Sequence, residues 1–89
     1  MHYEIHKIKN KIFKFKLDLN PVNSKYEPHI WHRHQIEPEQ VITAYFNISK
    51  QLYNHKYKRY EAYSTTDKLH IYYNNINFTT IMIITAFKI

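Results

Sequence analysis

Three histidines lie close together and raise the question of a metal site. His29, His32 and His34 are separated by three and two residues. These spacings do not place all three imidazoles on one face of a helix, and the chain has no cysteine to complete a site. The sequence therefore predicts neither a bound metal nor any other cofactor.

A second group of residues joins aromatic rings to positive charges. Tyrosines recur between residues 53 and 73, and Lys56, Lys58 and Arg59 stand among them. Rings stack on bases and cations hold phosphates, so the pattern indicates an RNA surface that includes Tyr57 and Tyr60 beside the two lysines. The alternative is that strands simply favour tyrosine.

Alternation along a strand would divide this group between two faces. One face would carry Tyr57, Arg59, Glu61 and Tyr63, and the other would carry Lys58, Tyr60 and Ala62. Only one of these faces can be the RNA surface, and the pattern does not decide which.

The charge of the chain also favours an anionic partner. Thirteen Lys and Arg against seven Asp and Glu give a net charge of +6, with the excess concentrated in residues 1–16 and 50–59. Clustered cations release counterions from a phosphate backbone and steer its encounter with the protein. A solvated face that keeps the protein soluble is the alternative.

Length and composition describe one small domain, residues 1–89. The absence of cysteine is typical of the reducing cytoplasm, and lysines interrupt the apolar positions of the first twenty residues, which predicts no signal peptide and no membrane span. The absence of glycine predicts that Asn or Asp fills any left-handed backbone position.

The elements that must position these residues can be predicted from periodicity. Residues 13–19 alternate apolar and polar side chains, which predicts a half-buried strand, with Tyr3 and Ile5 in its hairpin mate and a turn near Asn10. A short helix is expected over residues 28–34. A second helix should open at Pro38, where its apolar stripe is formed by Val41, Ile42, Tyr45 and Phe46.

The remainder of the chain predicts three strands, over residues 58–65, 69–73 and 78–87, in an antiparallel meander. The apolar run of residues 81–84 should lie in a central strand that is covered on both faces, or on one face by a partner chain. The expected fold is α+β, with two short helices packed on a mainly antiparallel sheet.

Four segments in this order carry a family likeness: HIWHRHQI at residues 29–36, EPEQV at 37–41, RYEAYSTT at 59–66 and IITA at 83–86. Over residues 29–89 the chain resembles the BrnT-like toxins of bacterial toxin–antitoxin modules, which belong to the RelE-like superfamily. The resemblance implies a RelE-like fold, a metal-independent endoribonuclease activity, and a cognate antitoxin protein that inhibits it.

The resemblance also implies roles for individual residues. His34 matches the family pattern and would be the acid or base, and Arg33 and Arg59 would hold the phosphate with help from Lys56 or Lys58. A structural alternative for His34 is a residue that bonds the last carbonyls of its helix.

Two departures from the family pattern favour a different function. Thr65 and Phe87 stand where family members usually carry arginines that suit phosphate binding. The alternative is therefore a catalytically inactive relative that retains the toxin fold and binds RNA or a protein. A third hypothesis is a regulator that pairs with a partner through residues 81–89. Whether the chain forms a homodimer stays open.

Overall fold

The N-terminal residues form the hairpin that alternation predicts. The computed structural model describes residues 2–89, apart from the side chain of His32. Strand β1 (His2–Ile8) pairs antiparallel with β2 (Lys11–Asn20) through a turn at Lys9 and Asn10. Phe13 and Phe15 are buried while Lys14 and Lys16 are not, so the period of two is confirmed there, whereas Leu19 near the end of β2 is exposed.

Both predicted helices are present. Helix α1 (His29–His34) follows Pro28, and helix α2 (Pro38–Phe46) opens with Pro38 at its first turn. The Glu37 side chain and the Gln40 side chain form a reciprocal capping box that satisfies two free amides at the start of α2. Val41 and Ile42 are buried in the core, whereas Phe46 stays at its margin.

The C-terminal meander is also confirmed, and it contains one strand more than predicted. Strands β5 (Arg59–Ser64), β6 (Leu69–Asn75) and β7 (Thr80–Lys88) pair antiparallel in sequence order. Strand β4 (Lys50–Asn54) adds an edge that periodicity did not predict, because four of its five residues are exposed and it has no apolar alternation. Strand β3 (Lys25–Pro28) was also missed, and it pairs with the far end of β2.

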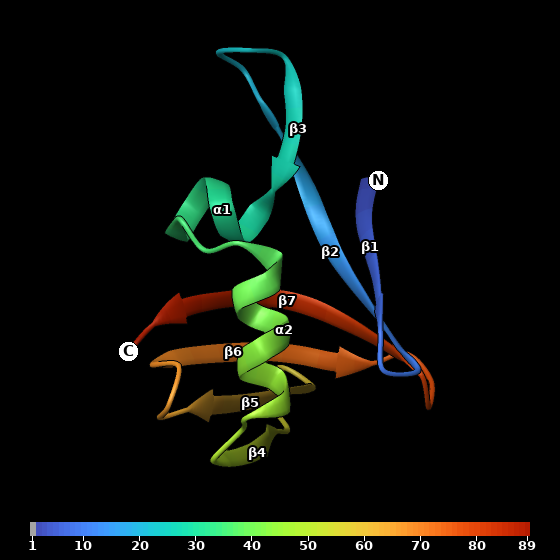
Figure 1. Cartoon of the computed structure of the whole chain (residues 1–89), viewed down its shortest axis with the longest axis vertical. Helices are drawn as coiled ribbons and strands as arrows, with labels where there is room; N and C mark the ends of the chain where they lie inside the picture. The colour runs from blue at the N-terminus through green and yellow to red at the C-terminus, as the bar shows by residue number, and fades with distance from the viewer. Residues whose placement is uncertain (1) are drawn as a thin grey trace.

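One seven-stranded sheet joins the two regions, in the order β1-β2-β7-β6-β5-β4 with β3 beside β2. The junction is parallel, because Ile12 to Phe15 of β2 pair with Thr80 to Ile83 of β7. Figure 1 shows α2 lying across the C-terminal strands and the β2–β3 hairpin extending away from them. The sheet is mostly antiparallel, and the α+β prediction is confirmed.

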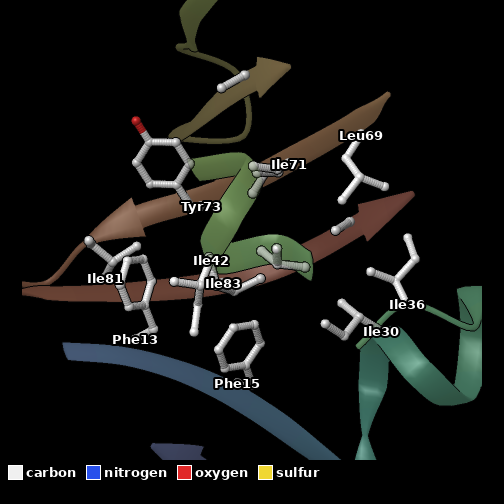
Figure 2. Close-up of a cluster of buried hydrophobic side chains, with 14 residues drawn as sticks. Phe13, Phe15, Ile30, Ile36, Ile42, Leu69, Ile71, Tyr73, Ile81 and Ile83 are labelled. Atoms are coloured by element: carbon white, nitrogen blue, oxygen red, sulfur yellow. The ribbon is translucent and has the colours of Figure 1, made fainter. Parts of the chain in front are cut away.

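The hydrophobic core lies between the helices and one face of this sheet. Its largest fully buried side chains include Phe13 and Phe15 of β2, Ile71 of β6, and Ile81 and Ile83 of β7. Figure 2 shows these residues converging on Ile42 of α2, on Ile30 of α1 and on Ile36 in the segment that follows α1. This core holds α2 across one face of the sheet and α1 where β2 and β7 diverge, so most of the opposite face is left uncovered.

The position of β7 confirms only part of the prediction for the apolar run. The strand is central, between β2 and β6. Ile81 and Ile83 are buried on the helix side, but Met82 and Ile84 are only half-buried on the other side. The expectation that this chain covers both faces of the strand is therefore wrong, because α2 packs only on the side of Ile81 and Ile83.

The prediction that Asn or Asp fills the left-handed positions is largely wrong. Only one of the six described residues with positive φ is of that type, Asn10; the others are Lys9, Ser24, Gln35, Lys58 and Lys68. Sheet pairing and helix capping fix these turns, so tertiary contacts override the local preference of the residue. Each such residue bears a steric strain of about 1–2 kcal/mol relative to glycine.

We expect Lys68→Gly to stabilise the fold, because Lys68 has φ 55° in the turn between β5 and β6. Relief of the strain exceeds the entropy that glycine adds to the unfolded chain, so the free energy of unfolding should rise by about 0.5–1 kcal/mol. Urea denaturation measures the change. Lys68→Ala is the control, and an equal gain from it would contradict this reasoning.

Neither described helix is long and apolar enough to cross a membrane.

Candidate nucleic-acid interface

The uncovered side of the sheet, here called the open face, carries polar and aromatic side chains. Residues paired across strands share a face, so the register assigns its members. They include Lys14, Met82, Asn74, Tyr72, His70, Phe87, Arg59, Glu61 and Tyr63. All of these are half-buried rather than enclosed. Their rings and polar groups are therefore accessible to a ligand that lies flat on the sheet.

A β-bulge brings Phe87 onto this face. Ile81 and Ile83 point into the core, so strict alternation would also turn residue 87 inward. The register between β6 and β7 instead shifts at Tyr72/Tyr73, which leaves Ile84 without a partner. Beyond the shift Ala86 is the buried residue and Phe87 pairs with His70 on the open face.

Phe87 lies at the centre of a group of rings. Its centroid is 4.9 Å from that of His70 and 5.3 Å from that of Tyr72, both in edge-to-face geometry. The His34 ring approaches the same phenyl ring from the end of α1, with centroids 6.0 Å apart. We call His34, His70, Tyr72, Phe87 and Arg59 the Phe87 cluster.

Arg59 completes the cluster on the far side of Tyr72. Its guanidinium carbon lies 4.1 Å from the Tyr72 ring centroid and 4.8 Å from that of Tyr57. Arg59 Nε donates to Glu61 Oε2 at 3.0 Å, and Asn54 donates to the same oxygen at 2.9 Å. This ion pair uses Nε, so the terminal amino groups of the guanidinium remain as further donors for an anion.

The ion pair also lowers the pKa of the Glu61 carboxyl group. The hydrogen bond from Arg59, followed by that from Asn54, holds the pKa of Glu61 below its ordinary value of 4.5. The unfolded chain then takes up this proton first on acidification. The stabilisation is complete above pH 4.5 and is lost as the pH falls through the pKa of the folded state.

We therefore expect Glu61→Gln to weaken the fall in stability below pH 4.5. Arg59→Gln should weaken the same dependence, because the bond that it removes is the largest cause of the shift. The measurement is the free energy of unfolding in urea over a pH series. An unchanged acid dependence in both variants would show that the pair does not form in solution.

The structure separates the residues that the sequence grouped as an RNA surface. Tyr57 belongs to the open-face group through its contact with Arg59, and the Lys56 ammonium lies 5.3 Å from its ring centroid. Tyr60 lies on the helix side, stacked on Tyr73 with centroids 5.3 Å apart. Lys58 occupies the exposed turn before β5.

His34 and Arg33 lie exposed in the last turn of α1. The structural alternative for His34 was a bond to the last carbonyls of the helix. Two carbonyls of the helix accept backbone amides of the residues that follow it, since Gln35 donates to Trp31 and Ile36 donates to Ile30. The His34 ring lies instead beside Phe87.

The two positions that depart from the family pattern have different surroundings. The hydroxyl of Thr65 is bonded to that of Ser49 at 2.9 Å, which ties the end of β5 to the segment before β4. Phe87 lies at the centre of the cluster.

Among the described side chains no three His, Asp or Glu residues form a group that could hold a metal ion; the side chain of His32 lies outside that set.

The sequence did not identify His70 as a candidate. Alternation along β6 puts His70 and Tyr72 on one face, but it does not reveal which strand lies beside them. The pairing of His70 with Phe87 depends on the register shift, which local sequence does not specify.

Comparison of the chain with protein-family models, curated proteins and solved structures gave no match. The resemblance to BrnT-like toxins therefore stays a prediction.

Proposed function

We propose that this protein binds single-stranded RNA at the Phe87 cluster and cleaves it there, acting as an endoribonuclease toxin that a cognate antitoxin inhibits. One observation carries the proposal: two histidines, His34 and His70, flank the same phenyl ring, and Arg59 lies beyond the adjacent Tyr72. Cleavage without a metal needs two groups that transfer protons and a cation that holds the phosphate.

The chemistry can be assigned to these side chains. The 2′-oxygen of one ribose attacks the adjacent phosphorus while one histidine removes its proton. The other histidine donates a proton to the departing 5′-oxygen, so the products are a 2′,3′-cyclic phosphate and a 5′-hydroxyl. Arg59 binds the charged phosphorane through its terminal amino groups, and Glu61 orients the guanidinium.

The geometry favours a single strand over a duplex. The rings of Phe87, Tyr72 and Tyr63 are half-buried on the open face, where an unpaired base can stack on them. Bases in an RNA duplex are already stacked, and the duplex shows mainly its backbone and a shallow groove to proteins. The substrate class proposed is therefore single-stranded RNA with a free 2′-hydroxyl.

Two assays with purified protein test this function. Single-stranded RNA should be cut, and DNA of the same sequence should remain intact, because DNA lacks the attacking 2′-hydroxyl. Cutting should persist in a chelator such as EDTA. Expression from a tightly controlled promoter in bacteria should arrest growth with decay of bulk RNA. Intact RNA in both assays would overturn the cleavage proposal.

A second candidate function is RNA binding without cleavage. It is favoured by Arg59, which already pairs with Glu61, and by Thr65 and Phe87, which replace the arginines of the family pattern. On this proposal the cluster stacks bases but lacks sufficient cationic charge for the transition state. Equal affinity for RNA and for its 2′-O-methyl analogue, with no decay of either, would support this candidate over the first.

A further inference from the structure

The open face extends well beyond the Phe87 cluster and contains a hollow near the N-terminal hairpin. This hollow has a volume of about 350 Å³ and is lined by Tyr3, Lys16, His29, Met82, Ile83 and Ile84. The lining comes from β1, β2, β7 and α1, which are four separate elements. Its volume falls within the range of about 300–1,000 Å³ that is usual for sites that bind small molecules.

The hollow combines a ring, cations and an apolar floor. Lys14 lies beside it, with its ammonium 4.6 Å from the Tyr3 ring centroid. Lys16 and His29 both approach Asp18, at 4.0 Å and 2.5 Å, so this one carboxylate faces two basic side chains. Met82 and Ile84 of β7 are half-buried there. A ring and apolar side chains in one hollow suit a base, and the lysines suit its phosphate.

Strand β7 contributes residues both to the hollow and to the Phe87 cluster, so it sets the distance between them. Met82 at the hollow and Phe87 in the cluster are in the same strand. Five residues of strand span about 17 Å, whereas successive bases of a stacked strand rise by about 3.4 Å. The stacked bases of a dinucleotide at the cluster therefore fall short of the Met82 side of the hollow, which a longer strand can reach.

We infer that the hollow between Tyr3, Lys16 and Met82 is a second RNA subsite, which binds a nucleotide several positions away from the one at Phe87. The inference rests on the proposed function, because it takes the ligand at the cluster to be single-stranded RNA. The occupant is the same strand, since basic side chains border the hollow and the net charge of the chain is +6.

RNA ligands of two different lengths test whether the hollow is a second subsite. The Lys14→Gln, Lys16→Gln double variant should bind a 2′-O-methyl octanucleotide more weakly. The slope of log affinity against log salt should become shallower by about 0.7 for each lysine lost. Binding of a dinucleotide, followed by NMR shifts of the Phe87 cluster, should not change. Lys14→Arg, Lys16→Arg keeps both charges and should retain the slope.

Lys9→Gln is a matched control, because the Lys9 ammonium lies over Phe46 on the helix side at 4.9 Å. It should leave the slope close to that of the parent protein. An octanucleotide that binds the double variant with the parent affinity and slope would overturn the subsite, as would an equal loss in Lys9→Gln. Failure of the proposed function is distinct: the dinucleotide would then cause no shifts at the cluster in any variant.

Discussion

We expect His70→Ala to lower the rate of RNA cleavage by about 10²- to 10⁴-fold, which is the loss typical of removing a general acid or base. His70 is half-buried among Tyr63, Tyr72 and Phe87. Strand pairing fixes the position of His70. The substitution to alanine therefore removes an imidazole that is already held in place for proton transfer. The measurement is single-turnover cleavage of a labelled RNA, with thermal unfolding as a check on the fold.

His34→Ala should reduce cleavage by a similar factor if His34 is the second proton-transfer group. The double variant should then lose much less than the product of the two factors, because residues that act in one step are not additive. His55→Ala is the matched control, since His55 is an exposed histidine in the turn after β4 and contacts Tyr53 rather than the cluster. Cleavage that survives in both single variants would contradict these roles.

The second large effect concerns stability. Phe13→Ala should lower the free energy of unfolding by about 3–5 kcal/mol, through the lost transfer energy and the cavity left behind. Phe13 is fully buried and packs edge-to-face on Tyr45 at 5.1 Å, where the parallel β2–β7 junction meets α2. Many small domains have a total stability of only about 5–15 kcal/mol, so the variant should be close to unfolding.

Phe78→Ala provides the control for this substitution, because Phe78 is 100% exposed in the turn before β7. The same change of residue type should there alter stability by less than about 0.5 kcal/mol. Equilibrium denaturation in urea measures both variants. Similar losses in the two would mean that the β2–β7 junction does not form the core described above.

Local patterns predicted those elements whose own residues specify them. The alternation around Phe13 and Phe15 located β2, and Pro38 located the start of α2. Strand β4 escaped prediction because its sequence, KQLYN, has no buried face. Strand β3 escaped because it is short and ends at Pro28, and its pairing with β2 is what makes it a strand.

The candidate site could be predicted only in part, because it depends on contacts between segments distant in sequence. His34 and Arg59 were identified as single residues from the family likeness. Their relation through Phe87 and Tyr72 requires the β6–β7 register and its shift at Tyr72/Tyr73. A one-residue slip in pairing moves a side chain to the opposite face, so alternation alone would have turned Phe87 into the core.

Which face of β5 is accessible also depends on contacts between segments that are distant in sequence. Sequence alternation separated Arg59, Glu61 and Tyr63 from Tyr60 and Ala62, and the structure keeps this division. The packing of α2 against the Ala62 side leaves the Arg59 side uncovered. That choice follows from where the helices pack, which no local pattern in residues 59–64 contains.

The most direct test of the central claim is an NMR titration of the whole chain with a single-stranded 2′-O-methyl RNA, which can bind but cannot be cut. If RNA occupies the open face, the largest shift changes will fall on His70, Tyr72 and Phe87, and the helix-side rings of Tyr45 and Phe46 will change little. Shift changes confined to the helix side, or none at saturating RNA, would contradict the claim.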